Sequence, residues 1–226
     1  WILLCPFCRR QALLKTGRQM SNDPLFCITC GRTTAFEAFS NTLGKIEQLI
    51  VLASRMIRKS ETPIKTVLLE QGVVAIISSM EILMRESYSI AYDHKHVVMG
   101  QSVYNDTYAR SRNEFLNLGS ANRWLKRILA LDLKSILSET DYGFLSRMYS
   151  DRHIIVHNSS IKDKQYLSQT AEPESQLRQP LVLKVGDVRK LVRISIAVGR
   201  KIATKLAKSL MSFQQVYLNT VRLVGG

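Results

Sequence analysis

The sequence IKTVLLEQGVVAIISSMEILMRESYSIAY, residues 64–92, predicts one long and largely buried α-helix. Its apolar residues recur every three or four positions, which is the period of one helix face. They include Leu68, Leu69, Val73, Ile76, Ile77, Met80, Leu83 and Met84. The longest apolar run without charge, residues 71–80, is about half of what a membrane span requires. We therefore expect a core helix of a soluble protein, with no membrane partner.

Helical periodicity continues on both sides of this segment. Ser138-Glu139-Thr140-Asp141 has the residues of a helix start, and Asp187 is expected to cap a basic amphipathic helix. The further helices are expected at residues 35–59, 113–131, 142–156 and 188–211. The polar residues 159–182 predict a loop or excursion, with a short strand possible at 181–183. The fold class is therefore mainly α, a bundle of four to five helices.

The chain is strongly basic, and its length suits one sizeable domain with a small module. Its 226 residues carry a formal net charge of +14, with a sequence pI of about 9.9. From residue 181 to 226 there are nine Lys and Arg against the single Asp187. Such a balance indicates an anionic partner, with nucleic acid as the first candidate. We expect a module at residues 1–34 and the helical domain at residues 35–226.

The four cysteines predict a structural zinc site. They form two C-x2-C pairs separated by eighteen residues, namely Cys5, Cys8, Cys27 and Cys30. This spacing is typical of zinc ribbons, in which four thiolates close the coordination shell of Zn²⁺ and leave no open position for catalysis. The alternatives are two disulfides or a redox pair. Disulfides are disfavoured because no secretory signal precedes the cysteines, which also favours a cytoplasmic location.

The segment Arg152-His153-Ile154-Ile155-Val156-His157-Asn158 holds two of the four histidines beside an arginine. On a straight helix Arg152 and His157 lie about 140 degrees apart, so they share a face only if the helix ends there or a second copy contributes. His153 and His157 are four apart and do share a face. Three interpretations remain open: ordinary polar residues at a helix end, a zinc site from the H-x-x-x-H pair, or acid–base chemistry on a phosphodiester.

The motif R-H-x-x-x-H late in a helix of an all-helical domain resembles the signature of the HEPN superfamily. Arg152, His153 and His157 fit its positions. The residues Val156-His157-Asn158, Lys162-Asp163 and Tyr166-Leu167 also resemble bacterial HEPN proteins, as does the segment SMEILMR at residues 79–85. The resemblance covers about residues 35–211, and the zinc ribbon lies outside it.

What the resemblance implies is a metal-independent endoribonuclease that acts as a homodimer through one composite cleft, with no catalytic metal. His157 would be the general acid or base on the ribose 2′-hydroxyl and the leaving oxygen, and Arg152 would hold the scissile phosphate. His153 would orient these groups, and Asn158 is a weaker candidate for a supporting hydrogen bond. A toxin or antiviral role, with an antitoxin or regulatory partner, fits many relatives. Ser159 stands where relatives that transfer nucleotidyl groups have tyrosine, which argues against that chemistry.

RNA is the expected partner, and the basic helix is its expected guide. Its candidate contacts are Lys190, Lys201, Lys205 and Lys208. A packed helix with a solvated lysine face is the alternative. Glu81 and Arg85, one turn apart, are expected to form an intrahelical ion pair on a solvated face, with a place in the cleft as the alternative. The alternative functions are a non-catalytic nucleic-acid-binding or sensor protein and a purely structural dimerisation module.

Overall fold

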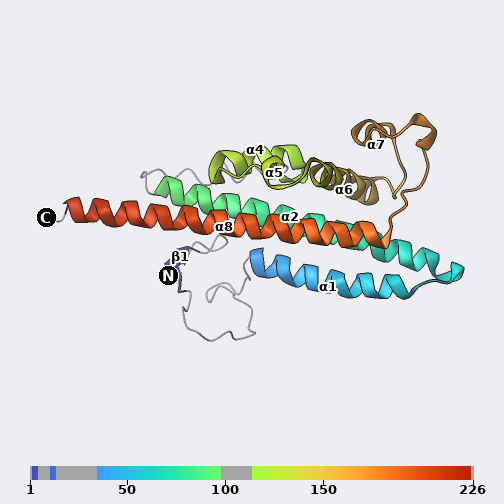
Figure 1. Cartoon of the computed structure of the whole chain (residues 1–226), viewed down its shortest axis with the longest axis horizontal. Coiled ribbons are helices and arrows are strands. Elements are labelled where there is room, and N and C mark those ends of the chain that lie inside the picture. Colours follow the sequence, from blue (N-terminus) through green and yellow to red (C-terminus); the bar gives the residue numbers. More distant parts are fainter. Residues whose placement is uncertain (1, 5–10, 14–34, 98–113, 225–226) are drawn as a thin grey trace.

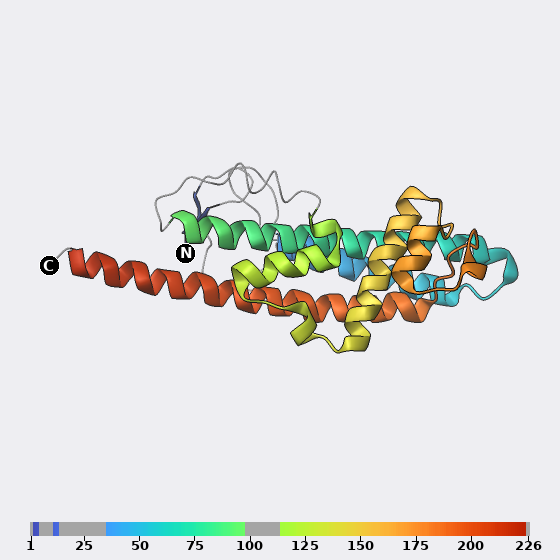
Figure 2. The same cartoon turned by 90° about the horizontal axis from the view of Figure 1, so that it is seen from above.

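The computed structural model describes residues 2–4, 11–13, 35–97 and 114–224, and these residues are mainly helical. Three helices run along the length of the molecule: α1 (Ala35–Arg55), α2 (Thr62–Val97) and α8 (Val185–Val224) (Figure 1). On the side of α2 and α8 away from α1 lie α4 (Leu118–Leu129), α5 (Leu133–Ile136) and α6 (Glu139–His157). Seen from above, α6 crosses the α2 and α8 pair (Figure 2). The described residues therefore form a helical bundle, as the sequence predicts.

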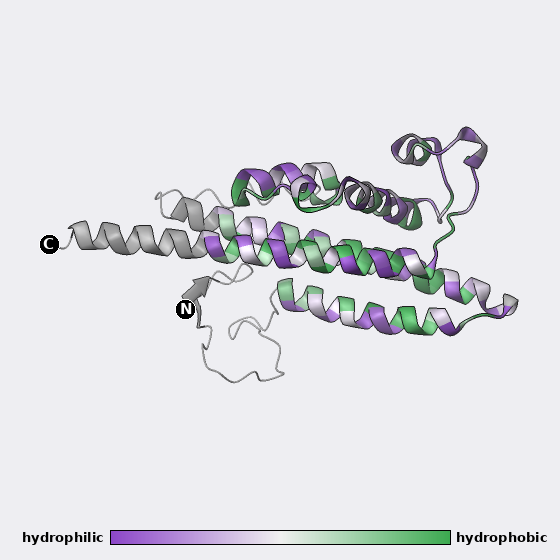
Figure 3. Cartoon of the chain, viewed as in Figure 1, coloured by the Kyte–Doolittle hydropathy of each residue, from purple (hydrophilic) through white to green (hydrophobic). Residues whose placement is uncertain are grey.

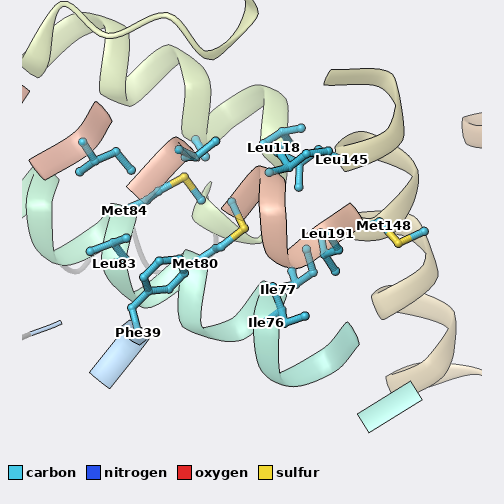
Figure 4. Close-up of a cluster of buried hydrophobic side chains, with 14 of the residues drawn as sticks. Phe39, Ile76, Ile77, Met80, Leu83, Met84, Leu118, Leu145, Met148 and Leu191 are labelled. Atoms are coloured by element: carbon cyan, nitrogen blue, oxygen red, sulfur yellow. The ribbon is translucent and has the colours of Figure 1, made fainter. Parts of the chain in front are cut away.

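The core is built around α2, as its periodicity predicts. Residues Leu69, Val73, Ile76, Ile77, Met80, Leu83 and Met84 are each at most 3% exposed. Figure 4 shows several of them beside Phe39 of α1, Leu191 of α8, and Leu145 and Met148 of α6. By length and composition, residues 62–92 are the one described stretch that could cross a membrane, but 56% of its most apolar window is buried inside the bundle. The apolar residues of α2 therefore pack inside the bundle and form its core.

Helices α1 and α8 approach closely at Gly199. A Cβ atom added there would lie 2.8 Å from Cε1 of Phe39, which is closer than real Cβ contacts. A larger residue would therefore force the ring of Phe39 to move. Glycine is needed here because the two helices pack too tightly for a side chain.

Polar side chains set the helix ends, in part where the sequence predicts. Ser138 is the N-cap of α6, and its side chain accepts a hydrogen bond from the N–H of Asp141. The expected helix at residues 113–131 is divided, because Asn117 caps α4 and leaves a separate 3-10 turn at Glu114–Leu116. Asp187 is expected to cap the basic helix, but it lies inside the first turn of that helix. The helix begins at Val185, and Asp187 accepts from the N–H of Lys184, like the acidic member of a capping box.

Residues 159–182 form an excursion from the bundle that is more regular than a simple loop. They contain α7 (Lys164–Thr170) and a 3-10 turn at Glu174–Gln176, and an isolated bridge pairs Ile161 with Pro180. No strand forms at residues 181–183. We call residues 159–182 the arm. Its capped short helix was missed because one turn and a half of helix carries almost no periodic signal.

The arm brings the described total to seven α-helices, more than the four to five expected, because α5 and α7 are too short to be recognised. Figure 3 shows that the arm is mostly hydrophilic, whereas hydrophobic residues recur along α1, α2 and the coloured part of α8. In the N-terminal module, β1 (Ile2–Leu4) pairs antiparallel with β2 (Gln11–Leu13). The four cysteines of the predicted zinc ribbon lie outside the described residues.

Candidate functional site

Helix α6 presents three faces, and the residues of the Arg/His motif are distributed among them. Met148 and Tyr149 are buried on the side that packs against the bundle. Asp151 and Ile154 are buried on the side that meets the arm. His153 and His157 lie between these sides and are exposed to solvent. Arg152 is about 140 degrees from His157 around the helix, so one protomer does not bring the two side chains onto one face.

The two histidines form a pair at the C-terminal end of α6. Their ring centroids are 4.9 Å apart, and the ring planes are inclined by 49 degrees. The spacing of four residues places them one turn apart, as the sequence predicts. His157 is the last residue of the helix. Both rings are therefore available to a ligand that approaches the helix end.

Arg152 is directed toward α2 rather than toward the histidines. It is half-buried, and its charge partly offsets the rise in pKa that burial causes in Glu81 on α2 and in Tyr149. Its Nε atom is buried and has no hydrogen-bond partner, and it forms no ion pair with a described carboxylate. A guanidinium in a partly dry site without a full set of acceptors is suited to bind an anion.

Glu81 lies near this guanidinium and is held by Arg85. The Arg85 Nη1 to Glu81 Oε1 distance is 3.6 Å, as expected for an ion pair one turn apart on α2. Burial raises the pKa of Glu81 above its ordinary value, although Arg85 and Arg152 act in the opposite direction. The positive charge of Arg152 is thus only partly balanced by this carboxylate.

Asn158 ends α6 and shapes the turn that follows. Its backbone N–H donates to the carbonyl of Ile154, and its side-chain Nδ2 donates to the carbonyl of Ile161 at 2.6 Å. The amide therefore holds the chain reversal after His157. A hydrogen bond from Asn158 to a substrate stays a prediction.

The four predicted RNA-contacting lysines lie on α8 but differ in their surroundings. Lys190 forms an ion pair with Asp141 at 2.9 Å, and its ammonium lies 4.7 Å from the ring centroid of Phe144. Lys201, Lys205 and Lys208 are exposed. They begin about 16 Å along the helix axis from Lys190. Of the four, the exposed three remain available to a partner, and Lys190 is largely committed to α6.

The arm supplies a buried polar contact that sequence reasoning missed. The carboxylate of Asp151, with no solvent exposure, accepts a 2.7 Å hydrogen bond from the hydroxyl of Tyr166. Burial raises the pKa of Asp151 to about 6, against the opposing effects of Tyr166 and Arg147. An aspartate in the sequence predicts an exposed residue, so only its place directly before Arg152 could have drawn attention to it.

Within the described ranges, no group of three or more His, Cys, Asp or Glu side chains could hold a metal ion. The H-x-x-x-H pair therefore has no third ligand among the described residues of its own chain. The predicted zinc ligands Cys5, Cys8, Cys27 and Cys30 are not among those residues, and their site stays a prediction.

Comparison with known proteins gives no assignment. No family model matches the chain, and no curated protein or solved structure is significantly similar to it. A function must therefore be argued from the site itself.

Proposed function

We propose that this chain is a metal-independent endoribonuclease of the HEPN type, which cleaves RNA at a site shared by two copies. One observation carries the proposal: a half-buried guanidinium with an unpartnered Nε lies one residue before an exposed histidine pair at a helix end. These are the groups that phosphodiester transfer needs without a metal, an anion-binding cation and imidazoles able to exchange protons near neutral pH.

The division of labour follows from the placement of each group. His157 is exposed at the end of α6. It takes the proton from the ribose 2′-hydroxyl as general base, or gives a proton to the leaving 5′-oxygen as general acid. His153, in ring contact with His157, orients it. Arg152 holds the scissile phosphate and stabilises the charge that develops on it. The products are a 2′,3′-cyclic phosphate and a free 5′-hydroxyl, so DNA resists cleavage.

We propose that a second copy completes the site. Because Arg152 and His157 project about 140 degrees apart in one protomer, a two-fold arrangement of two α6 helices is needed to place a guanidinium from one copy near an imidazole of the other. The exposed lysines 201, 205 and 208 on α8 provide a sequence-independent attraction for the RNA backbone. The zinc ribbon is proposed as a structural module, and a toxin or antiviral role stays a prediction.

The test is cleavage of a structured RNA by the purified chain in the presence of EDTA. His157→Ala and Arg152→Ala are each expected to lower the rate at least about 100-fold, because a positioned acid–base group contributes that much or more. His94→Ala and Arg58→Ala change the same residue types elsewhere and should keep the parental rate. A substrate with a 2′-deoxy group at the scissile nucleotide should resist cleavage. Parental rates in both motif variants, with folding intact, would refute the site.

A non-catalytic nucleic-acid-binding function is the second candidate, and the exposed lysines of α8 favour it. It predicts RNA binding that weakens steeply with salt and no turnover at any protein concentration. Lys201→Ala together with Lys205→Ala should lower the salt dependence of binding by about two counterions in either case. Cleavage in EDTA therefore separates the two candidates.

A further inference from the structure

The chain reverses direction immediately after His157, and the arm returns along α6. The N–H of Ser160 donates to the carbonyl of Ile154, and the N–H of Leu181 donates to the carbonyl of Ser160 at 2.7 Å. Ile154, Tyr166, Leu167 and Leu181 form a small apolar core between the arm and α6. The last two turns of α6, which carry both histidines, are thus packed against the arm on one side.

A buried polar network joins the arm to these two turns. Tyr166 is only 2% exposed, and its hydroxyl bonds to Asp151, while Glu172 Oε1 lies 3.4 Å from the same hydroxyl. Glu172 in turn accepts from Lys162 at 2.7 Å. Asp151 stands directly before Arg152 and His153, so a contact that fixes its side chain also fixes the rotation of the helix turn that carries them.

The arm is also held in backbone conformations that cost energy. Among the described non-glycine residues five have positive φ, and four of these are in the arm: Ser159, Ser160, Ala171 and Arg178. Such conformations cost about 1 kcal/mol or more each and persist where surrounding contacts enforce them. A simple surface connection would not require them.

We propose that Tyr166 is a positioning residue, which holds Asp151 and thereby sets the direction of His153 and His157 for catalysis. The assignment rests on the proposed ribonuclease function for its catalytic consequence, but the orientation of the imidazoles can be measured without any reaction. Tyr166 does not touch the histidines. It acts through Asp151 and the helix turn.

The test uses the full chain and its Tyr166→Phe variant, which keeps the ring in the small core and removes the hydroxyl. The imidazole ¹H–¹³C NMR signals of all four histidines are recorded, with His153 and His157 assigned by single substitutions. In the variant the signals of His153 and His157 should shift or broaden, and those of His94 and His96 should stay. If the chain cleaves RNA, kcat should fall on the order of 10-fold while KM stays within about twofold, because misplaced catalytic groups affect the chemical step.

Tyr142→Phe is the matched control, because Tyr142 lies in the same helix at its opposite end. It should leave the signals of His153 and His157 and kcat unchanged. Asp151→Asn keeps an oxygen that accepts from Tyr166 and should preserve both signals, whereas Asp151→Ala should reproduce the effect of Tyr166→Phe. The two Asp151 variants also decide the matter if Tyr166→Phe does not fold.

Unchanged histidine signals in Tyr166→Phe, or equal shifts in Tyr142→Phe, would overturn the positioning role. Shifted signals in a chain that never cleaves RNA would support the positioning role and count against the ribonuclease. The two proposals thus fail separately.

Discussion

The centre of the bundle and the junction between α6 and the arm are held together by different forces. The buried residues of α2 at the centre are largely apolar, and the hydroxyl of Ser195 there lies 2.9 Å from the sulfur of Met80. At the junction a buried carboxylate, a tyrosine hydroxyl and an ion pair lie within a small apolar cluster. Apolar burial depends on area and shape, whereas the junction also depends on the charge of Asp151.

The largest expected difference concerns leucines buried in each region. Leu145→Ala, in the bundle, should lower the free energy of unfolding by about 3 kcal/mol, because Leu145 has no solvent exposure and its removal leaves a cavity. Leu167→Ala, in the arm, should mainly destabilise the docked arm. Urea unfolding measures the first change, and amide hydrogen exchange of α7 measures the second.

This contrast would fail if Leu167→Ala lowered the global free energy of unfolding as much as Leu145→Ala does. The bundle and the arm would then unfold as one unit. Leu116→Ala, a partly exposed leucine at 39% exposure, is the control and should change either measurement by less than about 1 kcal/mol.

A second difference is expected in the response to pH. The pKa of Asp151 is raised by burial to about 6, so the folded junction binds a proton more tightly than the unfolded chain, in which aspartate titrates near 3.8. Stability from this group is therefore fully present at about pH 4 and is lost as the pH rises through 6. The loss should be about 2 to 3 kcal/mol between pH 4 and pH 7.5, measured by hydrogen exchange of α7 or by urea unfolding.

Asp151→Asn should remove most of this pH dependence, because the amide does not titrate. Glu81, whose pKa is also raised by burial, contributes with the same sign and will remain in the variant. The pKa of Asp132 is lowered to about 2 by hydrogen bonds from Asn122 and Lys126, so its contribution is lost only at more acidic pH. An unchanged pH profile in Asp151→Asn would mean that the buried carboxyl does not control the junction.

The smallest expected effects come from two matching helix ends. Ala130 ends α4 with φ 48, and Ala171 ends α7 with φ 54, both in the left-handed region that glycine adopts without strain. Ala130→Gly and Ala171→Gly should each be stabilising by up to about 1 kcal/mol. The first gain should appear in global urea unfolding, and the second in the exchange protection of α7. A loss of stability in both would contradict the assigned backbone conformations.

The long helices could be predicted from the sequence because their apolar residues repeat over many turns. Residues 64–92 give eight apolar positions at helical spacing, and the structure buries seven of them in α2, while Leu68 is only partly buried. Short elements gave no such pattern. Helix α7 was missed for this reason, and the break before α4 was missed because Asn117 acts through one capping hydrogen bond.

The candidate site was only partly predictable. The contact between His153 and His157 follows directly from a spacing of four, and the structure has it. The direction of Arg152 toward Glu81 could not be predicted, because it depends on which face of α6 packs against α2. The Asp151 to Tyr166 hydrogen bond spans fifteen residues and a chain reversal, so neither periodicity nor a local motif reports it.

Gly199 restricts how far α1 and α8 can slide along each other. The ring of Phe39 lies so near the backbone at this position that a Cβ atom would meet it at 2.8 Å, whereas every residue within four positions of Gly199 on α8 carries a side chain. Sliding either helix by one turn would therefore meet a steric barrier. Shear between these two long helices is therefore opposed at this one contact.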